Sequence, residues 1–187
     1  MSTIAHLCLT DFDRMIEAGV FDHGQRRRLE FIRGEIREMT PIGSRHEDVV
    51  DRLTEWSFRS LSEGTVWVRT QNSIGLPELE SAPEPDVAWV ARRDYSKGRP
   101  TAADVLLVIE VAESSLRYDS GEKADLYAEA GIADYWVVNV AERCVEVRRT
   151  PGAGRYHSLS TYTDDEEIRP LSFPDAVLRP AMLWQPE

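Results

Sequence analysis

Apolar and polar positions along the chain predict three helices and several strands. Residues 105–111 read VLLVIEV, a nearly continuous apolar run that predicts a strand buried on both faces. Residues 45–62 carry apolar side chains at helical spacing, which predicts a long amphipathic helix. A further helix is expected over 119–130, with Asp119 as its cap and Gly131 as its stop, and a short capped helix over 10–18.

Turn signals separate the remaining elements. Arg33-Gly34 lies between RLEFI and EIREMT and predicts a β-hairpin of residues 28–32 and 35–40. Further strands are expected at 65–70, 73–76, 86–90, 134–140 and 144–149. The tail after Pro151 is expected to alternate turns with short strand-like pieces. This order predicts an α/β fold with a mixed sheet flanked by helices.

Length and composition place the chain among soluble globular proteins. The 187 residues suit a single domain over 1–187, with a core at about 28–150 and a C-terminal extension over 151–187. The chain has 42% apolar and 29% charged residues and no membrane-spanning stretch or secretion signal. Because Cys8 and Cys144 are scattered, a reducing cytoplasm is the expected location.

The net charge of −11 argues against a broad nucleic-acid-binding surface, which is usually basic. Basic runs are local: Arg26-Arg27-Arg28, Arg92-Arg93 and Arg148-Arg149. Each is either a solvated face or a local contact. An acidic chain can still cleave nucleic acid, because a bound divalent metal changes the field of the site.

Three residues are candidates for chemistry. Glu110 is the one charge within its apolar run, and a buried carboxylate requires a cation or firm hydrogen bonds. Asp86 opens the apolar segment DVAWV, and Lys123 lies on the apolar face of the helix expected over 119–130. If the two strands are neighbours, both acids can meet and hold Mg²⁺ or Mn²⁺. The alternatives are a turn role for Asp86 and a lysine stem that extends to water.

The same segments carry a family resemblance. The stretches PEPDVAWV, VIEVAESS and YDSGEKADLYAEAGIADYWVVN closely resemble the Uma-type family of putative restriction endonucleases, within the PD-(D/E)XK nuclease superfamily. The upstream stretch LEFIRGEIREMTPIGSRHEDVVDRL is similar to the family's N-terminal hairpin and helix. The resemblance covers roughly residues 10–150. It implies a restriction-endonuclease-like mixed sheet flanked by helices, with an N-terminal helix and β-hairpin.

The resemblance also implies a metal-dependent nuclease site. Asp86 matches the first acid of the motif and Glu110 matches the second. Val111 would offer its carbonyl oxygen to the metal. The usual superfamily lysine would fall at Ala112, but the family pattern has a lysine on the next helix, which Lys123 matches.

Two weaker candidates follow from the same resemblance. Glu35 matches a family acid that either adds a metal contact or faces solvent, and His46 matches a position near the site that is otherwise a surface residue. The leading hypothesis is Mg²⁺- or Mn²⁺-dependent hydrolysis of DNA by water attack, with a homodimer as one possible state. The alternative is an inactive nuclease-fold module that binds nucleic acid or a protein partner.

Overall fold

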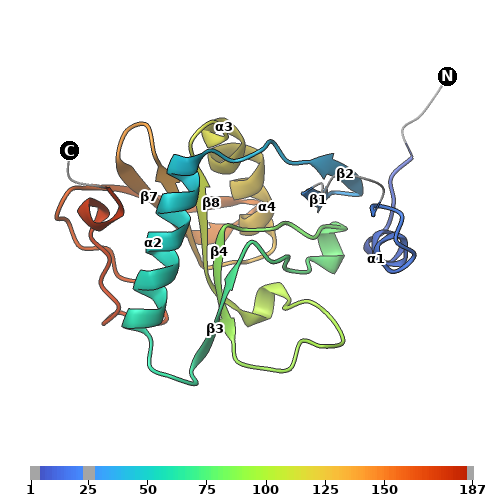
Figure 1. The fold of residues 1–187 in the computed structure, drawn as a ribbon, viewed down its shortest axis with the longest axis horizontal. Helices are drawn as coiled ribbons and strands as arrows, with labels where there is room; N and C mark the ends of the chain where they lie inside the picture. Colours follow the sequence, from blue (N-terminus) through green and yellow to red (C-terminus); the bar gives the residue numbers. More distant parts are fainter. Residues whose placement is uncertain (1–4, 23–27, 185–187) are drawn as a thin grey trace.

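The computed structural model describes residues 5–22 and 28–184 and centres on a six-stranded mixed sheet (Figure 1). The strand order is β3-β4-β5-β6-β7-β8, in which β5 and β6 are parallel and all other neighbours are antiparallel. The strands are β3 (Val66–Thr70), β4 (Val87–Ala91), β5 (Val105–Ala112), β6 (Asp134–Asn139), β7 (Cys144–Gly152) and β8 (Arg155–Thr163). This confirms the expected mixed α/β architecture.

Helical segments connect and cover the strands. They are α1 (Leu9–Glu17), α2 (Ser44–Ser60), α3 (Leu116–Tyr118), η3 (Asp119–Lys123) and α4 (Ala124–Glu129), with short 3-10 turns η1 (Pro77–Leu79), η2 (Ala102–Asp104) and η4 (Pro180–Leu183). Figure 1 shows α2 in front of the sheet and α4 behind it. None of the helices in the described residues is long and apolar enough to cross a membrane.

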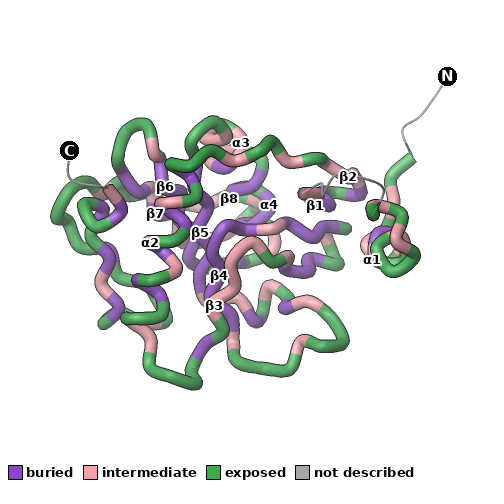
Figure 2. Tube along the Cα trace, viewed as in Figure 1, coloured by how far each residue is buried: buried purple, intermediate pink, exposed green. Residues whose placement is uncertain are grey.

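The apolar runs of the sequence form the middle of the sheet. All six residues of β6 are buried, as are the last six of β5 and the first four of β4 (Figure 2). Burial on both faces explains why these strands read as continuous hydrophobic runs rather than as alternating ones. The register pairs Val87 with Ile109 and Glu110 with Val137. It therefore places the start of β4 beside the end of β5.

The helix that follows β5 differs from its expected form. It begins at Leu116, so Asp119 lies inside it, and the expectation of a cap at Asp119 is wrong. Instead the Ser115 hydroxyl donates to the Asp119 carboxylate at 2.5 Å. Residues 119–123 form a π-helical turn, which a 3.6-residue periodicity does not reveal. Gly131, with a φ of 81°, follows the helix as expected.

The N-terminal hairpin is a separate two-stranded sheet of β1 (Leu29–Ile32) and β2 (Glu35–Glu38). Arg33 and Gly34 have positive φ values of 50° and 80°, as a two-residue hairpin loop requires. A Cβ atom on Gly34 would lie 2.9 Å from the Cβ atom of His6, so this turn needs glycine. Both features confirm the expected hairpin.

Two other expectations are wrong. Residues 73–76 do not form a strand, because Gly75 and Leu76 take part only in isolated bridges. The chain after Pro151 contains β8, which pairs along the whole of β7. β8 is an edge strand with mostly exposed side chains, so it lacks the apolar alternation that marks a half-buried strand.

Candidate active site

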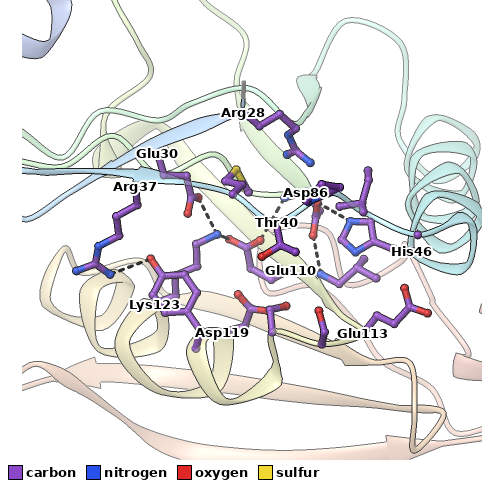
Figure 3. Close-up of a pocket in the computed structure, with 18 of the residues that line it drawn as sticks. Arg28, Glu30, Arg37, Thr40, His46, Asp86, Glu110, Glu113, Asp119 and Lys123 are labelled. Atoms are coloured by element: carbon purple, nitrogen blue, oxygen red, sulfur yellow. Dashed lines mark hydrogen bonds and ion pairs between the residues drawn. The ribbon is translucent and has the colours of Figure 1, made fainter. Parts of the chain in front are cut away.

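A cavity of about 400 Å³ lies where the start of β4 meets the end of β5 (Figure 3). The hairpin, the segment from β2 to α2, and the α3–η3 turn complete its walls. Asp86, Glu110, Val111 and Lys123 all line this cavity. The structure therefore brings together the four residues that the sequence proposed for catalysis and metal binding.

Asp86 lies just before β4 and is nearly enclosed, with 5% of its surface exposed. Its Oδ2 accepts a hydrogen bond from the Val111 backbone N–H at 2.9 Å, and its Oδ1 lies 3.0 Å from His46 Nε2. The Gln71 amide also donates to Oδ1, at 3.3 Å. Burial raises the pKa of Asp86, but the contact with His46 and the Val111 N–H outweigh it, so the net pKa lies below its ordinary value.

Glu110 and Lys123 form a buried ion pair. Lys123 Nζ lies 3.0 Å from Glu110 Oε1, and the Tyr127 hydroxyl donates to the same oxygen at 2.8 Å. Lys123 extends from the π turn η3 and is 2% exposed. Its stem therefore does not carry the amine to water.

Glu30 is a second carboxylate that pairs with Lys123, and the sequence did not identify it as a site residue. Lys123 Nζ lies 2.8 Å from Glu30 Oε1, so the amine sits between two carboxylates (Figure 3). The Glu84 backbone N–H donates to the same Glu30 oxygen at 2.9 Å. A signal did exist, because Glu30 is the lone acid in the apolar segment LEFI, just as Glu110 is in its own run.

The two weaker candidates occupy different positions. His46 lies in the first turn of α2, is buried, and contacts Asp86 directly. Glu35 is not among the residues that line the cavity, and it forms a partly exposed ion pair with Arg37 at 3.0 Å. The hairpin acids that line the cavity are Glu30 and Glu38.

Burial and neighbouring charges shift the pKa values of Glu110, Asp119 and Lys123. The carboxyl groups of Glu30, Asp86, Glu110 and Asp119 are all buried, and Lys123 is the central cation among them. Burial raises the pKa of Glu110 well above its ordinary value, and the neighbouring acids add to the shift, although Lys123 opposes it. Burial likewise raises the pKa of Asp119 to about 6. Burial lowers the pKa of Lys123, but Glu110 and Glu30 together raise it well above its usual range.

The donor set fits a hard divalent cation. Residues 5–22 and 28–184 contain no group of three or more His, Cys, Asp or Glu side chains that could hold a metal. Mg²⁺ usually takes only one or two carboxylates and completes its shell with water and substrate phosphate. Asp86, Glu110 and the Val111 carbonyl are such a set, and the surplus of buried negative charge favours a cation.

Arg28 is a second lining residue that the sequence did not single out by itself. Its terminal nitrogens Nη1 and Nη2 are enclosed, and neither has a hydrogen-bond partner among the described residues. A buried guanidinium with free donors is suited to bind an anion. Arg26 and Arg27, the other members of this basic run, lie outside the described residues.

Comparisons with known proteins identify a family and a shared fold. The Uma2 family model, described as "Putative restriction endonuclease", matches residues 9–181. A crystal structure described as "a putative nuclease belonging to DUF820 from Anabaena variabilis ATCC 29413" matches with a TM-score of 0.72 and 14% identity. The match covers 95% of this chain and 97% of that chain, and at this identity it shows the shared fold alone. A comparison with curated proteins finds no match.

Proposed function

Because the chain belongs to the Uma2 family of putative restriction endonucleases, we propose that it hydrolyses DNA phosphodiester bonds by water attack, with Mg²⁺ or Mn²⁺ as cofactor. The observation that carries this proposal is the convergence of Asp86, Glu110 and Lys123 in one cavity. A divalent ion held by Asp86, Glu110 and the Val111 carbonyl would polarise a phosphoryl oxygen and lower the pKa of the attacking water.

Lys123 supplies positive charge at the reacting phosphate. Its amine is fixed by Glu30 and Glu110, so it needs little reorganisation to donate to a phosphoryl oxygen or to the attacking water. Tyr127 and His46 act as positioning residues, since they hold the carboxylates of Glu110 and Asp86. Glu35 receives no role at the reacting atoms, because it does not line the cavity and its carboxylate pairs with Arg37.

Arg28 binds a substrate phosphate in this proposal. Its two enclosed terminal nitrogens can donate to two oxygens of one phosphate group, a geometry that guanidinium favours. This contact offsets part of the repulsion between a nucleic acid and the acidic cavity. It also explains how an acidic chain could hold DNA without a broad basic surface.

A cleavage assay tests the proposed activity. The purified protein is incubated with Mg²⁺, Mn²⁺ or EDTA on single-stranded, duplex and branched DNA. Asp86→Asn, Glu110→Gln and Lys123→Met should each reduce the rate at least about 100-fold, a typical loss for a group that stabilises transition-state charge. The control is Asp125→Asn, an exposed acid on α4, which should cleave like the wild type. Equal cleavage by all variants would indicate a contaminant and reject the proposal.

A second candidate is a nuclease-fold module that binds without cutting. Two observations favour it: the net charge of the chain is −11, and Ala112 stands where the superfamily lysine would be. Calorimetric titration with Mn²⁺ separates the two candidates. A functional site should bind the ion and lose it in Glu110→Gln, whereas an inert module should release little heat in either protein.

A homodimer would bring two such cavities to the two strands of a duplex. Light scattering of the purified chain measures this directly, because one chain has a mass of 21.3 kDa. A mass near twice that value, retained in the presence of DNA and metal, is the expected result. A single-chain mass under all conditions would contradict it.

A further inference from the structure

A second hollow, which we name the β3-edge groove, lies along β3 and the loop after β4. Its volume is about 840 Å³, and β3 is an edge strand of the sheet (Figure 1). Its lining includes three arginines, two aromatic residues and one acid: Arg69, Arg92, Arg93, Trp67, Tyr95 and Asp94. The groove is therefore locally basic in a chain whose net charge is −11.

Trp67 and Arg92 form a stacked pair at the surface. The Arg92 guanidinium carbon lies 4.2 Å from the centroid of the Trp67 ring, and the ring is still 42% exposed. The Trp67 indole N–H donates to the Arg93 carbonyl at 3.1 Å, which fixes the orientation of the ring. A fixed, partly exposed indole beside an arginine suits the stacking of a nucleobase.

The charges of Arg69 and Arg92 are available to a ligand. Neither arginine forms an ion pair with an acid within residues 5–22 and 28–184, whereas Arg93 pairs with Asp104 at 2.8 Å. Arg69 lies over the ring of Tyr95, and its enclosed Nε has no hydrogen-bond partner in that part of the chain. An enclosed N–H donor without a partner is stabilised when a ligand supplies a hydrogen-bond acceptor.

The groove is connected to the active-site cavity through β3. Trp67 and Arg69 are alternate residues and share one side of the strand. β3 ends at Thr70, and the next residue, Gln71, has a positive φ of 51° and donates its side-chain amide to Asp86 at 3.3 Å. The four residue steps from Trp67 to Gln71 cover about 13 Å at the rise of a strand, which is about four nucleotides at the helical rise of a DNA strand.

We propose that the β3-edge groove binds an unpaired segment of the DNA strand that is cut in the cavity. A base stacks on the Trp67–Arg92 pair, and a phosphate contacts Arg69. Stacking on an indole needs a base with a free face, so the substrate class is single-stranded DNA or a duplex with a frayed or branched end. This inference rests on the proposed function, because that function supplies the DNA strand in the cavity.

Binding of labelled oligonucleotides in EDTA, followed by fluorescence anisotropy, tests the groove without cleavage. Trp67→Ala should weaken binding of a 12-nucleotide single strand about 5- to 100-fold, the range for loss of one stacked base. Arg69→Gln, which removes the phosphate contact, should reduce the slope of log affinity against log salt by about 0.7, and Arg92→Gln should weaken binding by removing one side of the stack. A trinucleotide, too short to reach from the cavity to Trp67, should bind all variants equally.

The matched controls are Phe58→Ala and Arg59→Gln on α2. Phe58 is 65% exposed and the Arg59 side chain 78% exposed, and neither lines the groove. These controls should bind like the wild type. The inference is overturned if the groove variants also bind like the wild type, if the trinucleotide loses affinity equally, or if the wild type does not bind single strands.

Cleavage by the wild type with Mn²⁺ separates this inference from the function on which it rests. If the wild type cuts nothing but binding depends on Trp67, the proposed activity fails and the groove stands. If the wild type cuts and Trp67→Ala binds and cuts normally, the activity stands and the groove fails.

Discussion

On the α2 face of the sheet three tryptophan rings pack together, whereas the α4 face encloses an ion pair. The Trp56 ring centroid lies 5.0 Å from that of Trp89 and 5.9 Å from that of Trp136. On the other face, Glu110 pairs with Lys123 and accepts a hydrogen bond from Tyr127, a member of the apolar cluster of that face. The α2 face is thus an apolar core, whereas the α4 face combines an apolar cluster with the buried charge of Glu110 and of Lys123 in η3.

The α2 face therefore mainly stabilises the fold, whereas the α4 face carries the charged residues proposed for catalysis. Apolar burial on the α2 face stabilises the fold in proportion to the area removed from water. Buried charge on the α4 face is favourable only while each group keeps its partner, because desolvation of an ion is expensive. The sheet can therefore hold a charged cluster on one face because the other face is well packed.

The largest expected effect is the loss of the central cation. Lys123→Met should lower the free energy of unfolding by about 3–5 kcal/mol, because Glu30 and Glu110 would be left without their shared partner. Urea denaturation of the variant measures this loss. The triple variant Glu30→Gln, Glu110→Gln and Lys123→Met should regain most of the stability and remain unable to cleave. A triple variant as unstable as the single one would contradict this account of the cluster.

A mutation that creates a cavity in the apolar core of the α2 face should destabilise the fold without changing the residues of the candidate active site. Leu53 is fully buried on α2, and Leu53→Ala should lower the free energy of unfolding by about 2–5 kcal/mol. Mn²⁺ affinity, measured by calorimetry below the unfolding transition, should be unchanged. A parallel loss of metal affinity would show that the two faces are coupled more tightly than their separate contacts indicate.

Asp119 offers a pH-dependent test of the charged face. Its pKa is raised from 3.8 to about 6 by burial, so the folded protein holds the proton more tightly than the unfolded chain does. Stability should therefore fall as pH rises from about 4 to 6. Asp119→Asn should remove this fall and add about 1–3 kcal/mol at pH 7 in EDTA, with little difference below pH 4. Identical pH profiles of unfolding for the two proteins would refute this.

The smallest effect is expected on the solvent side of α2. Arg52 Nε lies 2.8 Å from Asp48 Oδ2, a partly exposed pair four residues apart. Asp48→Asn should change the free energy of unfolding by no more than about 0.5 kcal/mol, because water and salt screen such pairs. A loss above about 1 kcal/mol, measured by urea denaturation, would mean that this side of the helix contributes more than the comparison allows.

Local patterns predicted most of the fold and brought Glu110 and Lys123 to notice, while the family resemblance supplied Val111 and strengthened Asp86, and the catalytic role of these residues stays a prediction. The apolar runs located the central strands, and helical spacing located α2. Glu110 stood out because a lone acid in a buried strand requires a partner, and Lys123 lay on the helix face that could supply one. These inferences succeeded because strand alternation and helix periodicity determine which side chains face the sheet.

The remaining features depend on contacts between distant segments. Glu30 enters the site because the hairpin packs across the strand ends through the bridge from Phe31 to Ala82, 51 residues further along the chain. Arg28 becomes a candidate only when its donors are seen to lack partners. The π turn that carries Lys123 interrupts the helical period, so no regular pattern could reveal it.

Because of that π turn, the exact number of residues between β5 and Lys123 determines where the Lys123 amine points. A regular helix rotates by about 100° per residue, so removing one residue from Asp119–Lys123 would restore the α-helical winding upstream of α4. The helix could persist, but its register against the sheet would shift, and the amine of Lys123 would point away from Glu110. In this segment a single-residue deletion could thus disturb the candidate site more than many substitutions would.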